Sequence, residues 1–424
     1  MRILHVNKFL YRRGGAEAYM LDVAAAQAAG GHEVEFFAMR HPDNLPARFA
    51  EHFPRLVELE PAPPGLRRRA AAAGRMVYSR SSRRGIEAVV RAFRPDIVHL
   101  HNIYHQLSPS VLRPLKALGV PMVMTLHDAK LVCPSYLLLD HGKVCDACVL
   151  GRSFLPAVTH RCKDGSLAAS ALLAVESTVH RATRAYDPVQ IFICPSRFLA
   201  GKIAQGGVYP ERLQVLSNFI HADGITPKSQ PGGQVIYVGR LSYEKGADIL
   251  VDAVGRVASA QLDVVGDGPE RATLEALAAA RAPGRVRFHG QLPRQQVLDL
   301  VRSSAVLVMP SRCHENQPVA VLEAFACGVP VVASDLGGLP ELVKSGRCGQ
   351  VVPADDREAL ARALGQLLGD PERAFAMGQA ARAMVRRKFA VEHHLMRLEA
   401  MYGIVREELL RNQAEGRPGV IVRG

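Results

Sequence analysis

The sequence contains no tryptophan, and aromatic residues make up only 6% of its 424 residues. No basic helix carries the interleaved aromatic rings on which nucleic-acid bases stack, so nucleic acid is the least favoured partner. No apolar run reaches the roughly 20 residues that a membrane-spanning helix needs. The opening segment MRILHVNKFLYRRGG has too short an apolar part for a signal peptide and lacks a small-residue cleavage site. These absences lead us to expect a cytoplasmic protein.

Acidic residues are missing from residues 61–85, a stretch that is rich in arginine instead. The formal net charge of the whole chain is +13, which favours an anionic partner. The stretch suits a solvated basic helix and loop. It also suits a peripheral contact between the region from Arg67 to Arg84 and the anionic lipid head groups at the inner face of a membrane. The sequence leaves both interpretations open.

A single hydrophobic core rarely extends over 424 residues, so two domains of about 200 residues each are expected. Segments typical of buried strands alternate with helical segments in both halves, which predicts an α/β fold. The predicted strands lie at 3–7, 32–38, 95–102, 120–128 and 190–196, and within 234–246, 261–271, 285–293 and 304–311. A boundary is expected near residues 215–232. An amphipathic helix at about 390–413 can pack on either half.

The stretch from Ser311 to Gly338 combines a charged loop, an apolar helix and an apolar strand. Glu323 is the one polar side chain between residues 319 and 327. A helix that is apolar all round is normally buried, and a bare buried charge costs on the order of several kcal/mol, so Glu323 needs a ligand or a structural partner. Glu315 lies in the loop before this helix, where backbone N–H groups and the helix dipole favour an anionic or hydroxyl-rich guest. A structural Glu323 and a solvated Glu315 are the alternative.

Both ends of this helix carry boundary signals. Gln317 or Asn316 suits the N-cap, and Pro318 suits the first helical position. Gly328 stands where a left-handed helix stop is expected. The helix should therefore begin at Pro318 and end just before Gly328.

Two glycine-containing loops follow predicted strands and lead into helices. Gly14 and Gly15 let the backbone approach a bound group beside an electropositive helix start, although a glycine turn without a ligand is equally consistent. Arg240 and Lys245 lie in the corresponding loop of the second half, where two cations can clamp a diphosphate. Solvated surface charges are the alternative for this pair.

Polar residues end two neighbouring predicted strands of the first half. His101 and Asn102 end one strand, and His127 and Asp128 end the next. Open parallel sheets bind their ligands at the carboxyl ends of strands, which makes His127 a candidate for chemistry. A histidine in such a place is more often a structural hydrogen-bonding residue, and this alternative stays open.

Four of the eight cysteines, Cys133, Cys145, Cys148 and Cys162, fall within thirty residues and include one CxxC pair. In a protein expected in the cytoplasm this concentration favours a structural zinc site over disulfides. His160 can substitute for one thiolate as a ligand. Reduced thiols without metal are the alternative, because the outer spacings match no standard zinc finger.

Several of these motifs together resemble the retaining nucleotide-sugar glycosyltransferases of family 4, which have the GT-B fold. The resemblance rests on Glu315 and Glu323 with seven residues between them, followed by AFACGVPVVAS, and on GRLSYEKG and GDGPE upstream. It extends from the early GGAE to about residue 390. It implies two facing Rossmann-like domains with parallel sheets and a C-terminal helix that crosses back to the first domain. The implied domains are residues 1–216 on the acceptor side, with a cysteine-rich insertion at about 133–162, residues 217–392 for the nucleotide sugar, and the helix at 393–424.

The resemblance also implies roles for individual residues. Arg240 and Lys245 would bind the donor diphosphate and stabilise the leaving group, while Glu315 and His127 would lie beside the transferred sugar as the other catalytic residues. Glu323 would bind the ribose hydroxyls, and the first-domain loop would close over the phosphates. The implied donor-binding residues are Gly14, Gly15, Arg240, Lys245, Glu323, Gly290, Leu292, Asn316, Gln317 and Pro318.

The expected reaction moves a sugar from a nucleoside-diphosphate sugar to a saccharide, lipid-linked or small-molecule acceptor, with retention of configuration and without a catalytic metal. The product would belong to a cell-envelope polysaccharide, a glycolipid or a glycosylated metabolite. A sugar-nucleotide 2-epimerase or hydrolase on the same fold is the nearest alternative. From another class, a non-catalytic, zinc-stabilised protein of the membrane surface remains open. Cys313 and His314 depart from the family pattern, in which aromatic residues are frequent at these positions.

Overall fold

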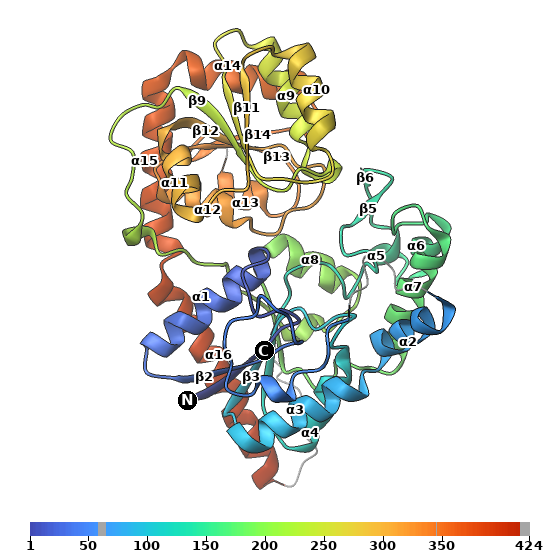
Figure 1. Cartoon of the computed structure of the whole chain (residues 1–424). Coiled ribbons are helices and arrows are strands. Elements are labelled where there is room, and N and C mark those ends of the chain that lie inside the picture. Colours follow the sequence, from blue (N-terminus) through green and yellow to red (C-terminus); the bar gives the residue numbers. More distant parts are fainter. Residues whose placement is uncertain (58–64, 345, 416–424) are drawn as a thin grey trace.

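The computed structural model describes residues 1–57, 65–344 and 346–415. It contains two six-stranded sheets in which every strand pair is parallel. Each sheet carries helices on both faces, and the two halves lie one above the other in Figure 1. The predicted α/β fold class, with two Rossmann-like domains, is confirmed.

The strands of the first sheet follow one another in space as β2 (Glu33–Phe37), β1 (Arg2–Val6), β3 (Ile97–Leu100), β4 (Met122–Thr125), β7 (Ile191–Cys194) and β8 (Leu213–Val215). Those of the second sheet follow as β11 (Val286–Gly290), β10 (Leu262–Val265), β9 (Gln234–Val238), β12 (Ser304–Met309), β13 (Val331–Ser334) and β14 (Gly349–Val352). All residues of β3, β4, β7, β10, β12 and β13 are buried, as expected for parallel strands covered on both faces. The edge strands β8 and β14 had not been predicted.

The strand order locates the place where each sheet can bind a ligand. In the second sheet the chain moves outward from β9 to β11 in one direction and then from β12 to β14 in the other. The loops after β9 and β12 therefore diverge at the carboxyl edge and leave a crevice between them. In the first sheet the corresponding point lies between β1 and β3.

Helices of the first half pack around the first sheet or form the segment that follows β4. They are α1 (Gly15–Ala29), α2 (Leu66–Val77), α3 (Arg80–Phe93), α4 (Leu112–Ala117), α5 (Ala147–Leu150), α6 (Leu155–Thr159), α7 (Leu167–Ala182) and α8 (Arg197–Gln205). A two-stranded hairpin of β5 (Leu139–Asp140) and β6 (Lys143–Val144) precedes α5. The second half contains α9 (Ala247–Arg256), α10 (Arg271–Arg281), α11 (Arg294–Ser303), α12 (Val319–Ala326), α13 (Leu339–Val343), α14 (Arg357–Gly369) and α15 (Pro371–Lys388).

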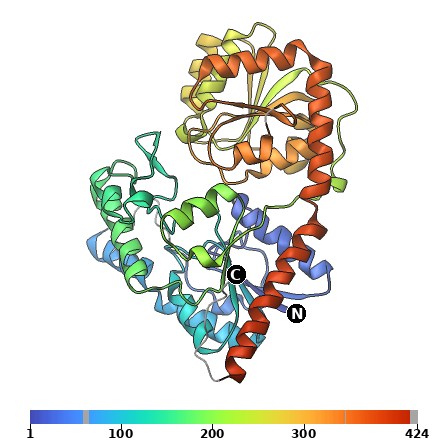
Figure 2. The same ribbon diagram turned by 180° about the vertical axis from the view of Figure 1, so that it is seen from behind.

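The last helix, α16 (Val391–Ala414), leaves the second half and runs along the first, as Figure 2 shows from behind. Its buried residues Leu398, Met401, Tyr402 and Val405 form a hydrophobic cluster with residues of β1, β3, β4 and α1. Full burial of an apolar side chain of this size stabilises by about 1.5–3 kcal/mol. The predicted amphipathic helix is therefore confirmed, and its apolar face packs on the first half.

The arginine-rich stretch contains α2 and the start of α3, while residues 61–64 lie outside the described residues. Arg67, Arg68 and Arg84 are exposed on these helices. Within the described part of the chain, no helix combines the length and the apolarity that crossing a membrane requires.

Candidate active site

The loops that diverge at the crevice of the second sheet carry a half-buried ion pair. The Lys245 ammonium, after β9, donates to Oε1 of Glu315, after β12, over 2.6 Å. The hydroxyl of Ser311 donates to the same oxygen over 2.8 Å. Burial lowers the pKa of Lys245, but the Glu315 carboxylate outweighs it and holds that pKa above its ordinary value. Lys245 is therefore a cation at neutral pH.

The double glycine after β13 sets the position of Glu315. Gly338 N donates to the backbone oxygen of Glu315 over 2.6 Å. A Cβ atom on Gly337 would lie 2.2 Å from that oxygen, and Gly337 has a φ of +66°. Both the contact and the left-handed backbone require glycine. The loop that carries Glu315 is thus packed against the following loop without room for a side chain.

Glu323 projects from α12 and pairs with an arginine of α11. Nε of Arg294 donates to Oε1 of Glu323 over 2.8 Å, and the Glu323 side chain is only 14% exposed. Burial raises the pKa of Glu323, and Arg294 opposes this effect. Within the described residues Oε2 receives no hydrogen bond, so it can accept one from a ligand. The expectation that Glu323 needs a partner is met here by Arg294, which the sequence had not indicated.

The start of α12 differs from its prediction by one residue. Pro318 is the N-cap rather than the first helical residue, and no side chain caps the helix. Gln317, predicted as a cap, instead accepts from the backbone N–H of Asn218. Gly328 has a φ of +75° and confirms the predicted left-handed stop. The N–H groups of the first turn of α12 therefore keep their capacity to bind an anion.

Asn316, the other predicted cap, connects the two halves of the molecule. Its Nδ2 donates to the backbone oxygen of His127, just beyond β4 of the first sheet, over 2.6 Å. The carboxylate of Glu341, in α13, accepts from the N–H groups of Arg197 and Phe198 at the start of α8 over 3.0 and 2.7 Å. These contacts bring His127 to the edge of the loop that carries Glu315. Local sequence patterns cannot indicate the Glu341 contact, because the two groups are far apart along the chain.

The His127 ring is the outer member of a row of imidazoles. Its Nε2 lies 3.1 Å from Nδ1 of His101, whose Nε2 lies 3.1 Å from Nδ1 of His5. His5 Nε2 in turn faces Oε1 of Gln27 over 2.8 Å. Burial, with a contribution from Lys8, lowers the pKa of His127 to about 3. His127 is thus neutral at physiological pH, and its side chain is only partly exposed.

Lys8 is a further residue of this edge that the sequence analysis did not single out. Its charge acts on both His127 and Asp128, so the ammonium lies near both. Burial raises the pKa of Asp128, and this cation opposes the effect. Lys8 follows β1 directly at the switch point of the first sheet, and that place in the sequence was the available signal.

The remaining candidates lie around the crevice without contacting the ion pair. The Arg240 side chain is exposed and forms no hydrogen bond or ion pair with another described residue. Gly15 opens α1, and a Cβ atom there would meet nothing within 4 Å, whereas one on Gly14 would lie 3.5 Å from Glu17. Gly290 has a φ of +69° at the end of β11, and Leu292 packs on the core of the second half.

Two residues that depart from the family pattern lie beside Glu315. Cys313 is buried, and the ring of His314 packs on Phe198 of α8 with a centroid distance of 4.4 Å. Neither ring nitrogen of His314 has a hydrogen-bond partner among the described residues. His314 therefore occupies the face between the halves that an aromatic residue would otherwise fill.

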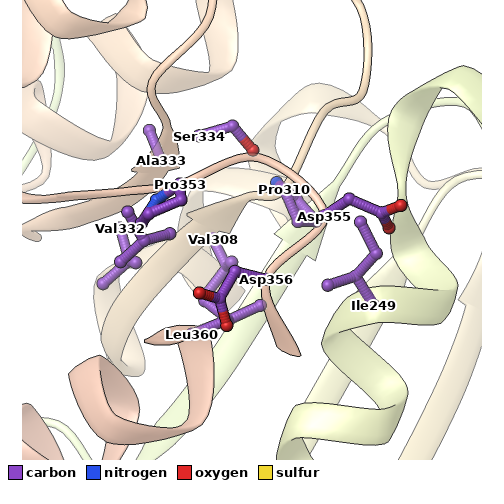
Figure 3. Close-up of a pocket in the computed structure, with 11 residues that line it drawn as sticks. Ile249, Val308, Pro310, Val332, Ala333, Ser334, Pro353, Asp355, Asp356 and Leu360 are labelled. Atoms are coloured by element: carbon purple, nitrogen blue, oxygen red, sulfur yellow. The ribbon is translucent and has the colours of Figure 1, made fainter. Parts of the chain in front are cut away.

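A small cavity lies at the same edge of the second sheet but on its other side (Figure 3). Its lining comes mostly from β12, β13, α9 and the start of α14, and includes Pro310, Ser334, Asp355 and Asp356. Its volume of about 10 Å³ holds at most one water molecule. A nucleotide does not fit in this space. The candidate site is the crevice beside Lys245 and Glu315, where the strand order of the second sheet reverses.

Two family models match most of the chain. The model described as "Glycosyl transferase 4-like domain" matches residues 14–218, and "Glycosyl transferases group 1" matches residues 223–384. The 2-deoxystreptamine N-acetyl-D-glucosaminyltransferase of Streptomyces fradiae is 32% identical over 297 residues, which are 67% of this chain and 65% of that protein. Two further relatives are matched over less than half of their length. The GDP-mannose-dependent alpha-(1-6)-phosphatidylinositol monomannoside mannosyltransferase of Mycolicibacterium smegmatis is 38% identical over 35% of this chain and 42% of that protein. The 2-deoxystreptamine glucosyltransferase of Streptomyces kanamyceticus is 38% identical over 39% of this chain and 44% of that protein.

Solved structures with low sequence identity share the fold. Sucrose-phosphate synthase from Thermosynechococcus elongatus has a TM-score of 0.72 and 21% identity, with 95% of this chain and 98% of that chain covered. Anabaena Alr3699/HepE, in complex with UDP-glucose, has a TM-score of 0.64 and 18% identity, with 95% and 99% covered. Both confirm the architecture of two facing Rossmann-like domains.

The buried histidines predict how stability depends on pH. Burial lowers the pKa of His5 and His394 to about 4 and of His127 to about 3, and it also lowers the pKa of His99 and His101. Below pH 6.5 the unfolded chain binds protons that the folded chain excludes, so stability falls as the pH falls. Each neutral buried histidine contributes a slope of about 1.4 kcal/mol per pH unit.

Urea unfolding at pH 7.0, 6.0 and 5.0 measures this slope. We expect His101→Asn to reduce it by about one proton, because one excluded proton site is removed. Replacing the exposed Gln205 with Asn serves as the control and should leave the slope unchanged, because this substitution removes no titrating group. Equal stability at all three pH values would contradict the prediction.

Proposed function

Since the chain belongs to the family 4-type glycosyltransferases of the GT-B fold, we propose that it transfers a sugar from a nucleoside-diphosphate sugar to an acceptor hydroxyl. The observation that carries this proposal is the Lys245–Glu315 pair at the switch point of the second sheet, joined to His127 through Asn316. The pair supplies a cation and a carboxylate at the carboxyl edge of the second sheet, and His127 of the first half lies beside the loop that carries Glu315. The acceptor would be a saccharide, a lipid-linked precursor or a small molecule of cell-envelope, glycolipid or metabolite synthesis.

The donor would bind mainly to the second half. Arg240, which has no competing partner among the described residues, and Lys245 would hold the diphosphate, together with the uncapped start of α12. Oε2 of Glu323 would accept from a ribose hydroxyl, while Arg294 holds the other carboxylate oxygen. The turn from Gly290 to Leu292 would face the base. HepE, which shares the fold, was solved with UDP-glucose, a donor of this class.

The chemistry follows from the charge that develops on the leaving group. As the glycosidic bond breaks, negative charge grows on the diphosphate, and fixed cations and N–H groups stabilise it. Losing one such donor typically costs about 2.7–4 kcal/mol. We propose that Arg240 and Lys245 supply this stabilisation where other enzymes use a divalent metal. The acceptor would attack from the face that the diphosphate leaves, and the leaving phosphate would take its proton, so the configuration is retained. We assign no carboxylate beneath the anomeric carbon for a covalent intermediate.

Donor binding tests the proposal. Arg240→Ala and Glu323→Ala should each raise the donor dissociation constant at least about tenfold, equivalent to 1.4 kcal/mol. Titration calorimetry with uridine, guanosine, adenosine and thymidine diphosphate sugars measures this. Arg362→Ala is the matched control, because Arg362 is exposed on α14, away from the crevice. Unchanged affinity in both site variants would refute the assignment.

Product analysis separates this reaction from its neighbours. A transferase releases nucleoside diphosphate faster when an acceptor is present. An epimerase or hydrolase forms product without any acceptor. A non-catalytic protein forms none.

We also propose that the enzyme works at the inner face of a membrane, held there by the arginines of α2. Arg67 and Arg68 are exposed, and the chain carries a formal net charge of +13. Each such cation contributes about 1 kcal/mol near an anionic surface. This contact would place the acceptor side next to a lipid-linked substrate.

Vesicle sedimentation tests the membrane contact. Binding to vesicles with anionic lipid should weaken as salt rises from about 0.05 to 0.5 M, because the Debye length shortens. The double variant Arg67→Glu with Arg68→Glu should lose this binding, whereas Arg362→Glu should not. Wild-type protein that stays in the supernatant at low salt would rule the contact out.

A further inference from the structure

The segment between β4 and α7 has very little hydrophobic core of its own. It contains the β5–β6 hairpin, α5 and α6, and its satellite cluster has only four buried members, Cys148, Phe154, Ala157 and Ala174. Segments of this size with so small a core normally need a disulfide or a metal to hold them. All eight cysteines of the chain are free thiols, so no disulfide does this.

The four cysteines of this segment converge on one cavity. Cys133, Cys145, Cys148 and Cys162 line it together with His160, and its volume is about 10 Å³. Space of this size suits one small ion rather than an organic ligand. Four sulfur atoms from four separate turns of the chain around one ion-sized space form a donor set typical of zinc.

Neighbouring polar groups favour a metal here. The Ser135 hydroxyl lies 3.3 Å from the sulfur of Cys133. Oδ2 of Asp140 lies 2.9 Å from Nδ1 of His160. Asp140, His160 and Cys162 bring their ligand atoms within 4.8 Å of one another, and among the described residues this is the group of three in the segment that meets this distance. The carboxylate and imidazole thus stand directly beside the sulfur cluster, as outer groups of metal sites commonly do.

We propose that this cavity binds one structural zinc ion through the thiolates of Cys133, Cys145, Cys148 and Cys162. The Asp140–His160 pair then borders the site without ligating the ion. Zinc binding displaces the four thiol protons to solvent, and no redox change occurs.

The bound metal would stabilise the β5–β6 hairpin, which reaches the loop that carries Lys245. Figure 1 shows the β5–β6 hairpin extending from the first half toward the second. At its tip, a Cβ atom on Gly142 would lie 2.5 Å from the ring of Tyr243, so the Gly142 backbone packs directly against that ring. Tyr243 precedes Lys245 by two residues, and the guanidinium of Arg312 stacks on its ring at 4.4 Å. The zinc site therefore supports the loop that presents Lys245.

Metal analysis of the whole protein tests the site. Protein purified without chelator should contain about one zinc per chain, and titration with a mercurial should release it as four thiols react. Cys145→Ser and Cys148→Ser should lose the metal, whereas Cys348→Ser, a buried cysteine of the second half, should keep it. His160→Gln should also keep it.

Hydrogen exchange gives a second measurement on the same variants. Exchange should rise within residues 133–166 in Cys148→Ser, while the strands of both sheets stay protected. Less than about 0.2 zinc per chain in the wild type would overturn the proposal. So would zinc retained in both cysteine variants, or lost in His160→Gln. None of these outcomes depends on transferase activity.

A second inference concerns the tautomer of His127, and its observation is independent of the metal site. Oriented hydrogen bonds link His127 to α16 through the interior of the first half. Nδ1 of His394 lies 2.9 Å from the backbone oxygen of Ser217, which can only accept. His394 therefore donates through Nδ1, and its Nε2 accepts from the Tyr19 hydroxyl at 2.9 Å.

A second series of hydrogen bonds takes its direction from Gln27, because its Nε2 can only donate and bonds to the Tyr402 hydroxyl. Thr125 accepts from Nε2 of His99 over 2.7 Å, and Nδ1 of His99 accepts from the Tyr402 hydroxyl over 2.7 Å. Tyr402 then accepts from Nε2 of Gln27 over 3.1 Å, which leaves Oε1 of Gln27 facing His5. With neutral rings, His5 donates to Gln27, His101 donates to His5, and His127 donates to His101.

We infer that this series of hydrogen bonds fixes His127 as the Nε2–H tautomer, with the lone pair of Nδ1 turned away from His101. Gln27 and Tyr402 are positioning residues, because they act on His127 only through the intervening rings. Under the proposed function, Nδ1 would accept a hydrogen bond from a hydroxyl of the transferred sugar. Through Tyr402, helix α16 thereby sets Nδ1 of His127 as a hydrogen-bond acceptor.

Nitrogen chemical shifts of the histidines test the tautomer directly. In the wild type, His127 should be an Nε2–H tautomer at pH 7. Tyr402→Phe breaks the chain while keeping the packed ring, so the Nδ1–H form of His127 should become populated. Tyr209→Phe is the control, because the Tyr209 hydroxyl donates to Asp187 and takes no part in this series of hydrogen bonds. It should leave the His127 tautomer unchanged.

The kinetic readout separates positioning from structure. Tyr402→Phe should lower kcat severalfold and leave the donor dissociation constant unchanged. An Nδ1–H tautomer in the wild type, or an unaltered tautomer in Tyr402→Phe, would overturn the inference. The nitrogen chemical shifts report the His127 tautomer even if no transferase activity is found. Failure of this inference can therefore be distinguished from failure of the proposed function.

Discussion

The hydrogen bond from Asn316 to the backbone oxygen of His127 is the contact on which the proposed site depends. It joins the loop after β12 of the second sheet to the end of β4 of the first, and so sets the separation of Glu315 and His127. The bond uses a backbone acceptor, so its geometry follows the sheet rather than a flexible side chain. Glu341 adds a second connection at the start of α8, where its negative charge meets the positive end of the helix. Two short polar contacts thus position two separately folded sheets, and they can break and re-form without disturbing either core.

The crossing helix α16 complements these contacts from the other side of the molecule. Its apolar face is buried against β1, β3, β4 and α1, so it ties the end of the second half permanently to the first. The same buried side of the helix carries Tyr402 and His394, whose polar atoms enter the hydrogen-bonded interior. The helix therefore combines mechanical connection with control of ring orientation. A packing surface made only of leucine would have provided the first without the second.

Sequence patterns predicted the architecture better than the contacts inside it. Buried apolar runs such as β12 identified the inner strands, whereas β8 and β14, of three and four residues at the edges, carry too little pattern to be recognised. The apolar environment of Glu323 showed that it needs a partner. That partner, Arg294, lies 29 residues away, and only the packing of α11 against α12 brings it there. Asn316 and Gln317 were expected to cap α12, but they bond to His127 and Asn218 because tertiary structure offered them backbone partners. Local propensity cannot register such competition.

The Lys245–Glu315 pair gives the proposed reaction a built-in order. Before donor binds, the Lys245 ammonium is already paired with the partly buried Glu315 carboxylate. Under the proposed function, an arriving diphosphate would take over this ammonium, and this would free an oxygen of Glu315 for the hydroxyls of the sugar. The exchange costs little, because one anion replaces another beside the same cation. A free Lys245 would bind any phosphate, whereas the paired one favours a ligand that supplies both the diphosphate and the hydroxyls. Through the Lys245 ammonium, the pair would thus link recognition of the diphosphate to recognition of the sugar.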